Sequence, residues 1–136
     1  MRAQEYIVQR RAQFSSDAQK SLFEQAKYTE GLARCQELLT ELRMRDPRHA
    51  DIGHLLYECA TFQKMSGRLE DAIATMHETL AFDLANEGEA SWNTVRSLSG
   101  LARLNLFVGR HELAEQLIRR GLAALQQLPA EQQDER

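Results

Sequence analysis

The sequence is poor in residues that interrupt helices. Its 136 residues include only two prolines and seven glycines, whereas alanine, leucine, glutamine, glutamate and arginine are abundant. Proline and glycine are the least favourable residues inside a helix, so their scarcity removes the usual obstacles to helix formation. We therefore expect helix along most of the chain, in one globular domain with a modest core.

Long apolar runs are also absent. No stretch approaches the roughly 20 apolar residues that cross a bilayer, and Arg2, Glu5 and Arg10 interrupt the region where a signal peptide would need an uncharged apolar segment. We therefore expect a cytoplasmic protein. The formal net charge of −3 gives no general attraction to nucleic acid or to an anionic membrane, so we expect neither as a partner.

Cysteine is scarce as well. Only Cys35 and Cys59 occur, and both fall in segments expected to be helical. A lone pair in a chain of this kind indicates reduced, buried thiols rather than a disulfide or a reactive site, because an unpaired cysteine usually behaves as a small apolar residue.

Groups that could carry catalysis are scattered along the chain. His49 and His54 are five residues apart, which places their rings on different faces of a helix. His54 and Cys59 have the same spacing, so they are poorly placed to bind one metal ion together. Gly67 and Gly109 are isolated, so no glycine-rich phosphate loop is present. We expect no enzyme, no metal ion and no cofactor.

What the sequence does contain is a repeated figure of six residues. Residues 67–72 read Gly-Arg-Leu-Glu-Asp-Ala, residues 109–114 read Gly-Arg-His-Glu-Leu-Ala, and a weaker copy at residues 26–31 reads Ala-Lys-Tyr-Thr-Glu-Gly. The last positions of the copies are 41 residues apart (from 31 to 72) and 42 residues apart (from 72 to 114). A nearly constant spacing of this length indicates an array of helical repeats.

Each copy is predicted to be the corner of a helical hairpin. Two such helices cannot cover both of their apolar stripes, so each hairpin is expected to stack on a neighbour, with Ala72 and Ala114 at the closest approaches. Asp46 is expected to cap a helix that starts at Pro47, and Asn86 with Glu89 has the spacing of a capping box. The expected helices are about 16–26, 29–44, 47–65, 69–80, 92–108 and 113–125, after a short helix or arm at 3–14.

The small residue before each corner, the corner itself, the following alanine and the Asp-Pro boundary together resemble the tetratricopeptide repeat family. The resemblance covers residues 12–128 as three repeats, with an arm at 1–11 and a polar tail at 129–136. It implies an all-α fold, a right-handed α-solenoid of about three antiparallel helical hairpins. The period of 41 to 42 residues exceeds the ~34 of that family and is similar to the lengthened repeats of kinesin light chains.

The resemblance also implies a protein-interaction module in which the first helix of each hairpin lines a concave groove. Its groove-facing positions correspond to Gln13, Lys20, Phe23, His54, Tyr57, Thr61, Lys64, Arg96, Arg103 and Phe107. Arginines in such a groove suit a partner peptide that carries carboxylates. The alternative is that these residues form ordinary solvated helix faces. Ser16, Glu58 and Gly100 stand where a clamp for Hsp70 or Hsp90 tails would need other residues, so such tails are not expected.

A second candidate surface lies near the end of the chain. Repeat arrays usually finish with a polar capping helix, yet only a short tail follows the apolar stripe Leu117, Ile118, Leu122 and Leu125. We expect this stripe to be an association surface, for a homodimer or another partner, unless Leu128 and the tail fold back over it. The leading hypothesis is thus an adaptor or a chaperone, similar to small bacterial secretion chaperones. The alternative is a self-associating scaffold or a sensory domain of a larger regulatory system.

Overall fold

The computed structural model describes the backbone of residues 3–133, with side chains for Glu5 and residues 24–131. All regular structure in this part of the chain is helical, so the prediction of an all-α fold is confirmed. The helices are α1 (Ala3–Arg45), α2 (Asp51–Met65), α3 (Leu69–Glu87), α4 (Trp92–Phe107), α5 (His111–Gln126) and the short α6 (Ala130–Gln133).

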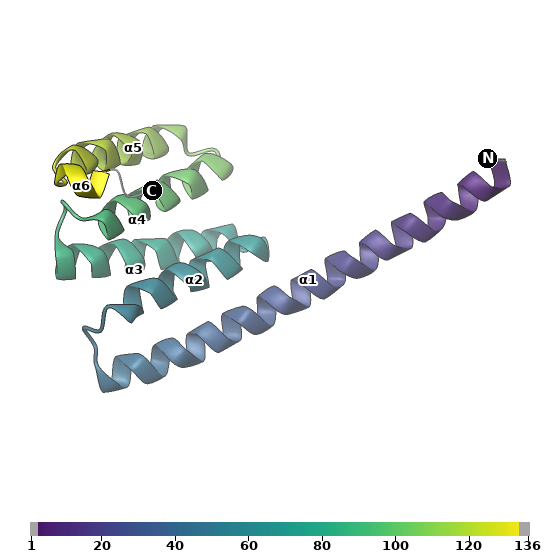
Figure 1. Cartoon of the computed structure of the whole chain (residues 1–136), viewed down its shortest axis with the longest axis horizontal. Helices are drawn as coiled ribbons and strands as arrows, with labels where there is room; N and C mark the ends of the chain where they lie inside the picture. The colour runs from purple at the N-terminus through teal and green to yellow at the C-terminus, as the bar shows by residue number, and fades with distance from the viewer. Residues whose placement is uncertain (1–2, 134–136) are drawn as a thin grey trace.

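Each of the first four helices packs on the next one along the chain (Figure 1). The helices α2 to α5 form a row, the second half of α1 lies along α2, and the first half of α1 extends away from the other helices. The main core gathers side chains of α2, α3, α4 and α5 around Met76, Leu98 and Leu101. Leu32, Cys35 and Cys59 form a smaller cluster where α1 meets α2.

Two corners in this row have the same construction. Gly67 and Gly109 take positive φ angles of 78° and 83°, a conformation that glycine adopts without steric cost. At the first corner the amide of Arg68 donates to the carbonyl of Gln63 at 2.8 Å, and at the second the amide of Arg110 donates to the carbonyl of Asn105 at 2.8 Å. In both cases the bond spans five residues and closes the C-terminal end of a helix. The predicted hairpin corners at 67–72 and 109–114 are therefore confirmed.

The third predicted corner, at Lys27 and Tyr28, is wrong. α1 runs through it without a break, so residues 16–26 and 29–44 belong to one helix and the expected first hairpin is not formed. The N-terminal segment is likewise the start of this long helix and not a separate short one. The physical reason is local: Ala26 stands where the other two copies have their positive-φ glycine, and alanine favours the continued helix.

The second half of α1 nevertheless keeps the buried face of the repeat. Leu32, Cys35 and Leu39 are buried in α1, and Ile73, Met76 and Leu80, each 41 positions later (from 32 to 73), are buried in α3. Because the same positions point inward, the periodic pattern predicted the contact face correctly even where it misplaced a turn. Ala72 and Ala114 are both 0% exposed, as expected of the closest helix approaches.

One predicted helix start and one predicted cap are also wrong. α2 begins at Asp51 and not at Pro47: the carbonyl of Asp46 accepts from the amide of His49 at 3.1 Å, so residues 46–49 form a separate turn before the helix. Before α4 the capping residue is Ser91, whose hydroxyl accepts from the amide of Thr94 at 3.1 Å. The predicted capping box at Asn86 and Glu89 is absent, since Asn86 lies within α3.

Both cysteines are buried and neither is bonded to another sulfur, so the prediction of buried thiols is confirmed. Burial raises the pKa of Cys35 to about 12, and the nearby carboxylate of Glu58 adds to the effect. None of the helices within residues 3–133 combines the length and the apolar composition needed to cross a membrane.

Candidate functional site

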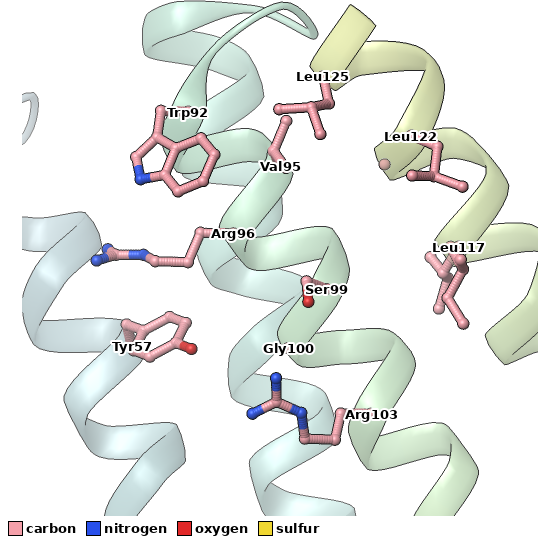
Figure 2. A pocket seen from close by; sticks show the side chains of 12 residues that line it. Tyr57, Trp92, Val95, Arg96, Ser99, Gly100, Arg103, Leu117, Leu122 and Leu125 are labelled. Atoms are coloured by element: carbon pink, nitrogen blue, oxygen red, sulfur yellow. The ribbon is translucent and has the colours of Figure 1, made fainter. Parts of the chain in front are cut away.

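A cavity of about 310 Å³ lies between α2, α4 and α5. Its lining joins two arginines to a mostly apolar wall, and Figure 2 shows these side chains meeting from the three helices. The lining residues are Tyr57, Trp92, Val95, Arg96, Ser99, Gly100, Arg103, Leu117, Ile118, Gly121, Leu122 and Leu125. We call this hollow the α4–α5 cavity.

Arg96 occupies one side of the α4–α5 cavity. Its guanidinium carbon lies 4.6 Å from the centre of the Tyr57 ring, an arrangement in which the cation is attracted to the ring face. One terminal nitrogen lies 3.3 Å from Nδ1 of His54, and Nε is buried with no hydrogen-bond partner among the described residues. Figure 2 shows the side chain extending between Trp92 and Tyr57. The aromatic neighbours thus fix the direction of a charge that is not fully hydrogen-bonded.

Arg103 lies two turns further along α4 and is exposed. It forms no hydrogen bond or ion pair with any residue that the structure describes. Among the described residues that line the α4–α5 cavity, none is acidic. The cavity therefore carries two positive charges with no carboxylate of its own to balance them.

The predicted association stripe forms the α5 side of the same cavity. Ile118 and Leu122 are 43% and 55% exposed, but Leu117 is only 8% exposed and belongs to the main core. The stripe is therefore only partly open, because Leu117 packs within the hairpin. Leu128 is 3% exposed, yet Ile118 and Leu122 remain accessible. The two surfaces expected separately from the sequence are parts of one hollow.

The predicted groove residues are divided among several places. Tyr57, Arg96 and Arg103 lie in the α4–α5 cavity. Thr61 and Lys64 line a shallow adjoining hollow of about 30 Å³ that also touches Tyr57 and Arg103. His54 faces a different cavity, next to α3. Phe107 is 68% exposed at the end of α4. The side chains of Gln13, Lys20 and Phe23 lie outside the described part of the structure.

Sequence reasoning missed the contribution of α5 to the groove, together with Trp92, Val95 and Ser99 on α4. It assigned the groove to the first helix of each hairpin. A signal was available for Ser99, which stands 42 positions after Tyr57 (from 57 to 99) and so takes the same place in the next repeat. The apolar stripe of α5 was recognised in the sequence, but as a separate association surface.

Comparisons with known proteins do not identify the chain. No protein-family model matches the sequence, and a search of curated proteins finds no match. Within the part of the chain that the structure describes, no group of three or more histidine, cysteine or acidic side chains is arranged to hold a metal ion. The geometry of the α4–α5 cavity is therefore the main guide to function.

Proposed function

We propose that this protein is a non-catalytic interaction module that binds a segment of another polypeptide in the α4–α5 cavity, as an adaptor or a chaperone in the cytoplasm. The observation that carries the proposal is the pairing of an apolar wall with two arginines that lack a carboxylate partner among the described lining residues. Apolar surface supplies affinity, and a few polar groups fix the orientation of the ligand.

The tetratricopeptide-like, right-handed stacking of helical hairpins is part of this proposal. The matching corners at Gly67 and Gly109 support it, and so does the shared inward face of α1 and α3. In such a row the faces of successive helices stay open to a partner along one side. A peptide with aliphatic side chains and a carboxylate would match the α5 wall and the arginines.

A peptide array followed by fluorescence anisotropy tests the proposal. We expect a discrete ligand whose affinity falls at least tenfold on Arg103→Glu, through charge reversal, and on Tyr57→Ala, through loss of the ring beneath Arg96. Arg119→Glu is the matched control, because Arg119 is exposed on α5, pairs with Glu115 at 2.6 Å and does not line the cavity. Binding that is indifferent to both cavity variants would discard the proposal.

A second candidate function is self-association through α5, with the chain acting as a scaffold or as a domain of a regulator. The specific observation is the exposure of Ile118 and Leu122 on adjacent turns of one helix. Light scattering across a concentration series separates the two candidates. A dimer that dissociates on Ile118→Asp would support self-association, and a monomer at all concentrations would count against it.

A further inference from the structure

The layer between α3 and α4 contains buried polar side chains where the neighbouring layer has apolar ones. Asp83 in α3 is 6% exposed, and the matching residues are Leu42 in α1 and Leu125 in α5, 41 and 42 positions away (from 42 to 83 and from 83 to 125). Ser97 in α4 is 0% exposed and stands 42 positions after Leu55 of α2 (from 55 to 97). Since the repeat packs with leucine at these places, it does not itself require a carboxylate and a hydroxyl.

Asp83 uses only one of its two oxygens within the fold. The Ser97 hydroxyl donates to Oδ2 at 2.6 Å, whereas Oδ1 accepts no hydrogen bond from any described residue. Burial raises the pKa of Asp83, and the Ser97 hydrogen bond works in the opposite direction. Oδ1 is accessible to solvent, so a ligand can reach it and donate to it. A link between α3 and α4 needs Oδ2 alone and leaves Oδ1 without a role.

Space for a ligand is kept open beside this oxygen. Asp83 lines a cavity of about 280 Å³ between α2, α3 and α4, which shares Arg96 with the α4–α5 cavity and no other lining residue. Gly53 of α2 forms part of its wall, and a Cβ atom added there would lie 3.0 Å from Oδ1 of Asp83 and 3.2 Å from the Phe82 ring. The matching residue of α4 is Val95, 42 positions later (from 53 to 95). The missing side chain at Gly53 is thus what leaves room next to the carboxylate.

The cavity is lined by charges of both signs, because Glu87, Arg48 and Arg96 border it together with Asp83. Glu87 is exposed and accepts from the side-chain amide of Asn93 at 2.9 Å, so Asp83 is the buried carboxylate of the cavity. The guanidinium of Arg96 lies over the Tyr57 ring. Arg48 also lines the cavity, and its side chain is exposed and forms no ion pair with the described residues. A ligand that contacts both Asp83 and Arg48 carries a cationic donor and an anionic acceptor a few bonds apart.

We propose that the cavity between α2, α3 and α4 binds a small zwitterion of the α-amino-acid class, with its ammonium group at Asp83 Oδ1 and its carboxylate at Arg48. The ammonium donates a hydrogen bond to Oδ1. The volume of about 280 Å³ suits a molecule of this size. The residues assigned to the ligand, Asp83 and Arg48, do not line the proposed peptide site, so each proposal can fail without the other.

Isothermal titration with the standard α-amino acids, each also as its N-acetyl and its amide derivative, tests the proposal. At least one amino acid should bind at millimolar or lower concentration. Its affinity should fall at least tenfold on N-acetylation, which removes the ammonium charge, and on conversion to the amide, which removes the carboxylate charge. Absence of binding by every amino acid, or equal binding by either derivative, would overturn it.

Three variants place the ligand in the cavity. Asp83→Asn should reduce affinity at least tenfold through loss of the charge, and Gly53→Ala should do so through loss of space. Arg48→Gln changes an exposed side chain and should leave the fold intact. It therefore tests the site even if a variant at a buried position does not fold. Arg48→Gln should lower the affinity for the amino acid, but it should leave the weaker affinity for the amide derivative unchanged. Arg103→Glu, in the other cavity, is the control and should have no effect. Unchanged affinity in a folded Asp83→Asn or in Arg48→Gln would contradict the assignment.

Discussion

The methyl group of Met76 in α3 lies against Gly100 in α4, so closely that a Cβ atom added to Gly100 would be 3.0 Å from Cε of Met76. Cys35 and Glu58 hold the same two places one repeat earlier, and there Sγ donates to Oε2 at 3.4 Å. The first pair gives a side-chain packing contact and the second a hydrogen bond. The repeat therefore preserves where helices meet while the chemistry of the meeting point changes.

The effect of substituting Gly100 on stability should depend strongly on the size of the new side chain. Gly100→Ala is expected to be neutral or to stabilise by up to about 1 kcal/mol, because alanine is the better helix former and the flexible end of Met76 can move aside. Gly100→Leu should destabilise by about 1–3 kcal/mol through overpacking. Urea unfolding of both variants measures the difference. Equal effects of the two substitutions would show that the contact does not limit packing.

Gly109 and Gly121 should respond in opposite directions to alanine. Gly109→Ala forces an alanine to a φ of 83° and should cost about 1–2 kcal/mol. Gly121→Ala lies inside α5, where the nearest atom to an added Cβ is 3.7 Å away, an ordinary contact, and should stabilise by up to about 1 kcal/mol. Thermal unfolding checks the signs, and a stabilised Gly109→Ala would mean that this corner is not as described.

The thiol of Cys35 should be unreactive in the native protein. Burial is the main cause that raises its pKa to about 12, so the reactive thiolate is scarce at neutral pH. Titration with a disulfide reagent at pH 8 should label both thiols rapidly in denaturant and only slowly in the folded state. The native rate should rise with pH as the thiolate forms. Fast native labelling of Cys35 would argue against its buried place between α1 and α2.

The ion pair between Glu89 and Arg120 should give stability that acid removes. Its two bonds, at 2.7 and 2.9 Å, tie the segment before α4 to α5, and they hold the pKa of Glu89 below its usual value of 4.5. A carboxyl whose pKa is lower in the folded state stabilises above its unfolded pKa and loses that contribution as the pH falls through the folded pKa. Both side chains are 41% exposed, so the contribution is about 0.5–1 kcal/mol after solvent screening.

Glu89→Gln measures that contribution directly. At pH 7 the variant should be less stable than the parent protein by the amount stated, and the difference should shrink on acidification below pH 4.5 and at high salt. Urea unfolding at several pH values gives the comparison. A difference that persists unchanged at low pH would mean that the effect of the substitution is not electrostatic.

Local features of the chain were sufficient to predict the helices and two of their corners. At Gly67 and Gly109 a single residue type permits the backbone to turn, so the sequence marks the place. The weaker copy at residues 26–31 was assigned a corner from spacing alone. Its first residue is Ala26, and the local preference of alanine prevailed over the period of the repeat. The predicted capping box at Asn86 and Glu89 failed because the side chain of Ser91, closer to the start of α4, supplies the cap.

The candidate sites depend on contacts that no local pattern specifies. Periodicity identifies the inward face of a helix, but it does not state which helix that face will meet or at what depth. Arg96 lines a cavity because α4 lies between Tyr57 of α2 on one side and the leucines of α5 on the other. Asp83 became buried because α4 brings Ser97 within 2.6 Å of it. Helix and turn were decided by each residue's own backbone preferences and by neighbours a few positions away. Burial, charge pairing and cavities were decided by residues 14 to 42 positions apart that only packing brings together.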